Sequence, residues 1–263
     1  MTRPDENKDK ASFELSDEEL KKIVAEADTG GRKLTGFTAQ LLLMVALAWS
    51  LFQLWIASPL PFSLGVFVFN DTESRAIHLA FAIFLAFAAY PAFKRSPRDY
   101  VPVQDWVLAA VAAFCAAYLF LFYKELAQRP GTPTDMDLAA AVVGMLLLLE
   151  AARRALGLPM VVLAAVFLVY IFFGPYMPEV IAHRGASLSK GMSHMWLTTE
   201  GVFGVAVGVS TSFIFLFVLF GALLETAGAG AYFIKSAIAL LGHMRGGPAK
   251  AAVVASASTG LIS

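Results

Sequence analysis

Long apolar segments without charged side chains constrain this chain more than any other feature. Five of them lack Asp, Glu, Lys and Arg over 18 to 24 residues: Phe37–Ala57, Ala76–Phe93, Trp106–Tyr123, Leu158–Pro178 and Gly201–Leu224. A sixth, Leu138–Leu149, is shorter, but its helix can run from a cap at Asp135 or Asp137 to about Arg153. About 20 helical residues cross the hydrocarbon core of a bilayer. The pattern predicts an all-α integral membrane protein with about six transmembrane helices.

Composition excludes several other classes of protein. The chain is 58% hydrophobic and 15% charged, with a mean hydropathy of +0.68, whereas soluble domains are nearer 45–50% and about 25%. A formal net charge of zero gives no electrostatic footprint for nucleic acid. The single cysteine, Cys115, lies in an apolar run, where packing is its expected role.

The sequence carries no pattern typical of an enzyme. It has no nucleophile elbow, no phosphate-binding Gly-Lys-Ser/Thr loop and no dinucleotide fingerprint. Glu179 and His183 have i,i+4 spacing, but one such pair is weak support for a metal. We therefore predict no enzymatic activity, no catalytic residue, no metal site and no cofactor apart from a coupling cation.

Basic residues orient the predicted spans. If all six cross the membrane, one side collects Arg32, Lys33, Lys94, Arg95, Arg98, Arg153, Arg154, Arg245 and Lys250. The other side has Arg75, Lys124, Arg129, Arg184 and Lys190. The positive-inside rule then places the N-terminus in the cytoplasm. The first 36 residues carry 16 charged side chains and no apolar h-region, so we expect the first span to act as a signal anchor.

Several shorter segments are expected outside the spans. Ser16 and Glu19 form a capping box for a short helix, which is either interfacial or a docking element. Residues 186–198, with Leu188, Met192, Met195 and Trp196 on one face, and residues 231–244 are predicted to lie along the membrane surface. Trp55, Trp106, Trp196 and Tyr123 are expected to be interfacial aromatics. Glu150 is expected to pair with Arg153 or Arg154 on its own helix.

The segment from Gly246 to Ser263 differs from every apolar run before it. It is built of small residues and hydroxyls and has no aromatic side chain. Such a segment suits a re-entrant hairpin packed inside protein. Gly246, Gly247 and Pro248 form its predicted hinge.

Hydroxyl groups make this segment a candidate binding site. The candidate cation- or substrate-binding residues are Ser256, Ser258, Thr259, Gly260 and Ser263. Hydroxyl oxygens suit a hard cation such as Na⁺, and broken helices bind ions in secondary transporters. The alternative is that these hydroxyls bond the backbone of their own helix.

A second polar cluster interrupts the last long span. Ser210 and Thr211, with Ser212 beside them, are further candidates for the binding site. They either line a substrate path or serve helix packing through backbone hydrogen bonds.

Specific motifs in the second half resemble a transporter family. They are Leu197-Thr198-Thr199-Glu200-Gly201-Val202-Phe203-Gly204, Phe217-Val218-Leu219-Phe220-Gly221-Ala222, and the segment from Gly246 to Ser256. Glu150 to Arg154 and Phe173 to Tyr176 also fit. Together they resemble the fused permease of tripartite ATP-independent periplasmic (TRAP) transporters, in the branch paired with TAXI-type binding proteins. The resemblance covers roughly residues 136–263, and residues 37–130 fit as a hydrophobic pattern.

The resemblance implies a division of the chain. Residues 1–36 would be a cytoplasmic N-terminal segment, and residues 37–157 a four-helix scaffold similar to the small TRAP subunit. Residues 158–263 would begin the large transport subunit, with the first hairpin starting near Gly246. In that family the hairpin motif continues Ile-Ser-Gly-Ser-Ser, and Ile262-Ser263 match its first two positions. We therefore expect the chain to be an N-terminal fragment.

The resemblance also implies a function. The chain would be a component of a secondary active permease in the bacterial inner membrane, working by an elevator mechanism. A periplasmic TAXI-type solute-binding protein would deliver a small organic anion, and a Na⁺ or H⁺ gradient would drive uptake. Its other partners would be the remainder of the permease and the lipid bilayer. The alternative is a scaffold or assembly subunit without a transport cycle.

Overall fold

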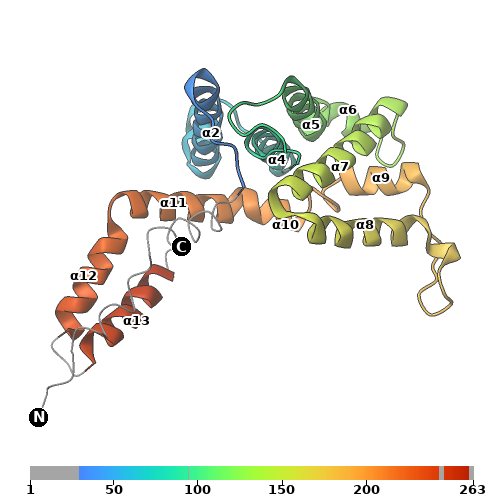
Figure 1. The fold of residues 1–263 in the computed structure, drawn as a ribbon. Coiled ribbons are helices and arrows are strands. Elements are labelled where there is room, and N and C mark those ends of the chain that lie inside the picture. The colour runs from blue at the N-terminus through green and yellow to red at the C-terminus, as the bar shows by residue number, and fades with distance from the viewer. Residues whose placement is uncertain (1–29, 94, 243–245, 261–263) are drawn as a thin grey trace, which may run out of the picture.

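The computed structural model describes residues 30–93, 95–242 and 246–260, and helices are its regular elements (Figure 1). No strand occurs within these ranges, as expected for an all-α membrane protein. The capping box predicted at Ser16 and Glu19 lies outside the described residues. Element labels begin with α2.

The first half of the chain forms a bundle of long helices. The bundle consists of α2 (Gly36–Ala57), α4 (Asp71–Ala89), α5 (Val103–Leu121) and α7 (Asp135–Leu156), with short α3 (Leu60–Leu64) and α6 (Tyr123–Gln128) in the connections. α4 packs most extensively against α5, and α2 and α7 lie against this pair (Figure 1). The predicted segments thus become neighbouring helices.

The second half begins with α8 (Leu158–Phe172) and α9 (Leu188–Trp196), both packed on α7. A continuous helical rod follows, made of α10 (Val205–Val209), the π-helix η2 (Ser210–Ile214) and α11 (Phe215–Thr226). The last two helices, α12 (Ala229–Leu241) and α13 (Gly247–Gly260), pack on one another and extend away from the bundle (Figure 1).

Within the described residues, four helices are long and apolar enough to cross a membrane. They are α2, α4, α5 and the rod Val205–Thr226. The other two predicted spans differ from these for identifiable reasons. α7 has 22 residues but carries charges at both ends. α8 has 15 residues and ends where Gly174 and Pro175 enter a 3-10 turn, so the predicted span to Pro178 is not one helix.

The start of α7 corrects one detail of the sequence analysis. The N-cap is Thr134, one residue before the predicted Asp135. Asp137 occupies the third helical position, where its carboxylate accepts a hydrogen bond from the Thr134 amide at 2.8 Å. The Thr134 hydroxyl accepts from the Asp137 amide in return. This reciprocal pair satisfies two amides that the helix itself leaves unbonded.

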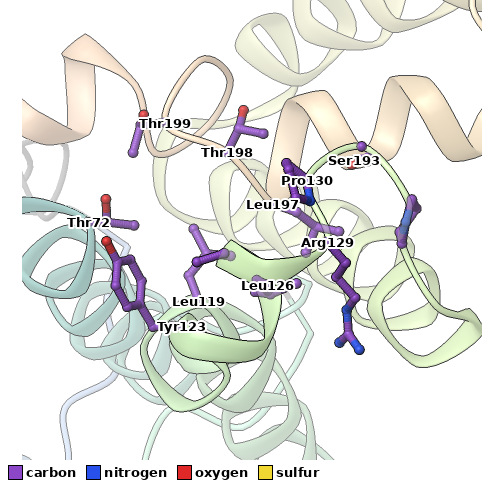
Figure 2. A pocket seen from close by; sticks show the side chains of 13 residues that line it. Thr72, Leu119, Tyr123, Leu126, Arg129, Pro130, Ser193, Leu197, Thr198 and Thr199 are labelled. Atoms are coloured by element: carbon purple, nitrogen blue, oxygen red, sulfur yellow. The ribbon is translucent and has the colours of Figure 1, made fainter.

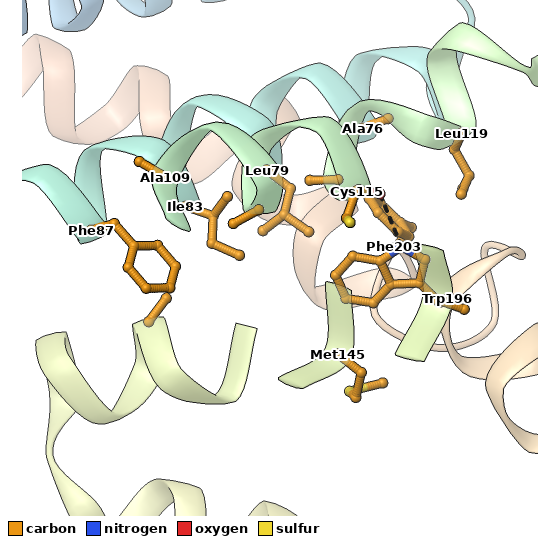
Figure 3. Packing of buried hydrophobic residues seen from close by; sticks show 14 of the residues in the cluster. Ala76, Leu79, Ile83, Phe87, Ala109, Cys115, Leu119, Met145, Trp196 and Phe203 are labelled. Atoms are coloured by element: carbon orange, nitrogen blue, oxygen red, sulfur yellow. Dashed lines mark hydrogen bonds between the residues drawn. The ribbon is translucent and has the colours of Figure 1, made fainter. Parts of the chain in front are cut away.

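Trp196 is not an interfacial aromatic, because it is fully buried in the main core. Its indole N–H donates to the Cys115 carbonyl at 3.0 Å, and its ring meets Phe203 edge to face (Figure 3). A side chain at Gly144 would collide with the indole, so the absence of one on α7 creates the space. Cys115 is itself buried, as its apolar surroundings predicted.

The apolar face predicted for residues 186–198 packs against protein. The helix exists as α9, but Met192 and Trp196 on its apolar face are buried against the bundle. Leu188, at the start of this helix, has 54% of its surface exposed. Sequence periodicity identifies an apolar face, but it does not distinguish a lipid surface from a protein surface.

Charged residues are buried where three helix ends meet. Asp105, at the start of α5, accepts from Arg32 and from Arg154 Nη1, the latter at 2.9 Å. Glu150 pairs with Arg153 at 2.7 Å and with Arg154 at 2.8 Å, which confirms the predicted helical ion pairs. Arg32 also donates to the carbonyls of Phe87 and Ala88 at the end of α4. We call these five charged side chains the ionic cluster: Arg32, Asp105, Glu150, Arg153 and Arg154.

Candidate functional site

The C-terminal helix pair contains most of the candidate binding residues. Ala237 of α12 meets Ala251 and Ala255 of α13 in a small buried cluster. Alanines allow two helix backbones to approach closely. Gly246 has φ +71, which suits glycine, and a Cβ at Gly247 would collide with the Leu241 carbonyl. Gly246 directly precedes α13, which packs along α12, and the role of Gly246, Gly247 and Pro248 as a hinge stays a prediction.

A cavity of about 730 Å³ lies between these two helices. Its lining residues are Ile234, Ile238, Gly242, Ala251, Ala252, Ala255 and Ser256. Ser256 supplies the hydroxyl in this otherwise apolar lining. One hydroxyl is far fewer than the six to eight oxygens that a hard cation such as Ca²⁺ collects. The described residues therefore provide a groove and one ligand atom, not a complete cation site.

The remaining candidates of this segment are placed only in part. Ser258, Thr259 and Gly260 belong to the last turn of α13, and Ser263 lies outside the described residues. Gly260 is exposed. Their role in binding stays a prediction.

Ser210 and Thr211 are in a different place, within the π-helix of the rod. The Thr211 hydroxyl donates to the Val207 carbonyl at 2.7 Å, and the Ser212 hydroxyl to the Gly208 carbonyl at 2.8 Å. For Thr211 and Ser212, these bonds favour the alternative that the hydroxyls bond the backbone of their own helix. α12 is the main packing partner of α13, whereas η2 packs on α10, α11 and α4. The structure thus does not assemble the two predicted groups into one site.

Ser210 instead joins a buried polar cluster that the sequence analysis missed. Its hydroxyl lies 3.1 Å from His78 Nε2 on α4. Trp49 Nε1 lies 3.3 Å from His78 Nδ1, and the Gln53 amide contacts the same nitrogen. An indole can only donate, so Nδ1 accepts and the neutral ring donates from Nε2 to Ser210. We call these four residues the His78 cluster: Trp49, Gln53, His78 and Ser210.

The His78 cluster connects helices from both halves of the chain. Gln53 is fully buried, and its Oε1 has no hydrogen-bond partner among the described residues. Nearby, Arg75 donates to the carbonyls of Phe203 and Gly204 at 2.8 and 3.0 Å. The signal in the sequence was the presence of Gln53 and His78 inside apolar spans, where polar side chains are expensive. Two polar side chains of α4, Arg75 and His78, thus hold the rod and the residues just before it.

Replacing His78 by leucine should lower the free energy of unfolding by about 1–3 kcal/mol, because the amide of Gln53 and the hydroxyl of Ser210 lose a buried partner. Equilibrium unfolding of the detergent-solubilised protein measures the change. The matched control is Ser212→Ala, whose hydroxyl bonds its own helix and whose loss should cost less. Equal stability of the two variants would show that the His78 cluster does not fasten the rod.

A smaller cavity of about 250 Å³ opens where α6 meets the loop after α9 (Figure 2). Thr72, Thr198 and Thr199 line it together with Arg129. The Arg129 guanidinium points away from Thr198 and Thr199 (Figure 2) and donates to Asp137 at 2.9 Å. Tyr118 also donates to this fully buried carboxylate, at 2.7 Å. The Arg129 guanidinium is thus paired with Asp137 at the start of α7, and the other polar side chains that line the cavity carry hydroxyl groups.

The segment with the pair Glu179 and His183 does not form a metal-binding helix face. Residues 179–181 form a turn. His183 Nε2 lies 2.8 Å from the Tyr170 carbonyl, and Nδ1 accepts from the Gly185 amide. No group of three or more His, Cys, Asp or Glu side chains suited to a metal occurs within the described part of the chain.

Comparison with known proteins supports one family. Residues 142–263 match the model of the family described as "Tripartite ATP-independent periplasmic transporter, DctM component". The match begins inside α7 and includes α8 to α13. Neither the curated proteins nor the solved structures contain a match. The second half of this chain is therefore similar to the DctM permease component of TRAP transporters.

Proposed function

We propose that the chain is a membrane permease component of a secondary active, binding-protein-dependent TRAP transporter. Its substrates would be small organic anions such as carboxylates, and a Na⁺ or H⁺ gradient would drive their import into the bacterial cytoplasm. The observation that carries the proposal is the DctM match over residues 142–263 in a chain with four membrane-length apolar helices. The motifs from Leu197 and from Gly246 favour a TAXI-type binding protein as the partner.

The arrangement of the helices fits a division between scaffold and transport parts. The main core joins α4, α5, α7 and α9, and the ionic cluster connects the ends of the same bundle. α12 and α13, in contrast, pack mainly on one another. A rigid bundle with a projecting helix pair is the arrangement that an elevator mechanism requires, because one part must move while the other stays fixed.

The helix pair is also the part suited to binding. α13 presents Ser256 toward a groove between two closely packed helices. Discontinuous helices surround ion and substrate sites in secondary transporters. We propose that Ser256, Ser258, Thr259, Gly260 and Ser263 contribute to the cation or substrate site.

Uptake by the complete gene product in proteoliposomes, with its binding protein, tests the proposal. We expect labelled carboxylates to accumulate under a Na⁺ or a proton gradient, and accumulation to cease when that gradient is dissipated or the binding protein is omitted. Separate ionophores for Na⁺ and H⁺ identify the coupling ion.

Two outcomes would contradict the proposal. Accumulation that persists after both gradients are dissipated would exclude secondary transport. A folded, correctly inserted protein that accumulates no carboxylate under either gradient would favour the scaffold alternative, for which the extensively packed bundle of α4, α5, α7 and α9 is the supporting observation.

A further inference from the structure

A basic pocket of about 390 Å³ lies at the end of the bundle where α4 and α7 finish. Its lining residues are Gly30, Pro91, Ala92, Phe93, Arg98, Arg153 and Arg154. They come from the segment before α2, the α4–α5 connection and the last turn of α7. The fold therefore brings together cations that are more than 50 residues apart in the sequence.

Positive charge exceeds negative charge around this pocket. The described arginines at this end are Arg32, Arg95, Arg98, Arg153 and Arg154, and the described carboxylates are Asp99, Asp105 and Glu150. Asp105 and Glu150 are already paired within the ionic cluster. The excess cations therefore attract an anion from outside the protein.

Two of the lining arginines are held in fixed positions. Arg153 donates to the Ala92 carbonyl at 2.7 Å and forms a two-point contact with Glu150. Arg154 is 3% exposed and stacks over Phe87 at 4.6 Å. Arg98 is exposed and has no ion-pair partner within the described part of the chain. The pocket thus combines two arginines held in fixed positions, Arg153 and Arg154, with the exposed Arg98 at its rim.

An apolar wall distinguishes this pocket from a site for a free ion. Phe93 is 70% exposed, and the Arg153 guanidinium lies 5.2 Å from its ring centre. The same helix end continues into the membrane-length apolar helix α4. A ligand here would contact guanidinium groups and an aromatic ring at the boundary of a hydrophobic span. Anionic lipid headgroups bind in surroundings of this kind.

We propose that this pocket binds the phosphate of an anionic membrane lipid. Arg98 and the Nη1 group of Arg153 contact the phosphate oxygens, since guanidinium N–H groups donate charge-assisted hydrogen bonds to phosphate. Phe93 packs against the glycerol and the upper acyl chain. The bound lipid bridges the α4–α5 connection and α7, and so fastens the end of the bundle. The site depends on the chain being a membrane protein and not on its transport activity.

The purified full-length protein tests this site with dioleoyl phosphatidylglycerol as the probe and dioleoyl phosphatidylcholine as the neutral reference. Native mass spectrometry counts bound lipids over a titration. We expect phosphatidylglycerol to bind more tightly than phosphatidylcholine, and Arg98→Gln to weaken it about fivefold, as removing one cation near an anionic lipid should. The matched control is Arg184→Gln, an exposed arginine remote in sequence from the pocket, which should leave binding unchanged.

A second variant separates a lipid from a free phosphate. Phe93→Ala should weaken phosphatidylglycerol binding and leave competition by inorganic phosphate unchanged. If inorganic phosphate displaces the lipid at equal concentration, the pocket is a site for the free anion and the proposal is wrong. Equal binding of the two lipids, or equal losses for Arg98→Gln and Arg184→Gln, would also overturn it.

Discussion

Replacing Asp105 by asparagine is expected to lower the free energy of unfolding by about 3–5 kcal/mol, because the buried Arg32 loses its carboxylate partner and the buried Arg154 loses one of its two carboxylate partners. Asp105 is 1% exposed and accepts from Arg32 and Arg154, which are themselves 0% and 3% exposed. Asparagine is neutral and turns an N–H group toward one guanidinium. Arg32 would then lack the carboxylate that compensates for its loss of water, and Arg154 would keep Glu150 alone of its two carboxylate partners. Equilibrium unfolding in detergent measures the difference.

The control for this prediction is Asp99→Asn. Asp99 lies in the same α4–α5 connection but is exposed, so its change should stay within about 0.5 kcal/mol. A loss below about 1 kcal/mol at Asp105 would mean that the arginines find water or other acceptors. The ionic cluster would then not be what holds the ends of α4, α5 and α7 together.

Trp196→Ala is expected to cost about 3–5 kcal/mol, as other truncations of large buried aromatics do. The ring fills the space over Gly144 and packs on Phe203, while its N–H bonds the Cys115 carbonyl. Alanine leaves a cavity at the junction between the bundle and the segment after α8. The same unfolding measurement reports the loss.

Two controls separate the size of the ring from its hydrogen bond. Trp196→Phe keeps much of the aromatic volume and loses the N–H donor, so we expect a smaller loss than for alanine. Tyr232→Ala removes a ring that is 69% exposed and should have little effect on unfolding in detergent. If Trp196→Ala is no worse than Tyr232→Ala, the junction does not depend on this side chain.

The helices were predictable because their signals are local. Uncharged apolar runs located α2, α4, α5 and the rod within a few residues. The spacing of Glu150, Arg153 and Arg154 predicted their ion pairs, since residues three and four apart share a helix face. Motifs in the second half predicted the family that the comparison later matched.

The candidate site was less predictable, because it depends on which helices become neighbours. Ser210 was identified as a polar residue of interest, but its partner His78 is 132 residues away. The position of Trp196 near a span end predicted an interfacial aromatic. In the structure its ring enters the core, in the space that Gly144 leaves because it has no side chain. The local sequence pattern does not distinguish an apolar helix face that contacts protein from one that contacts lipid.

The sequence by itself determined that this is a helical membrane protein, because the cost of placing charge and unpaired backbone in hydrocarbon acts on each segment separately. The tertiary structure alone decided the ionic cluster, the His78 cluster and the basic pocket at Phe93 and Arg98. Each of these requires side chains from distant segments to meet, and such meetings follow from helix packing, not from any one segment.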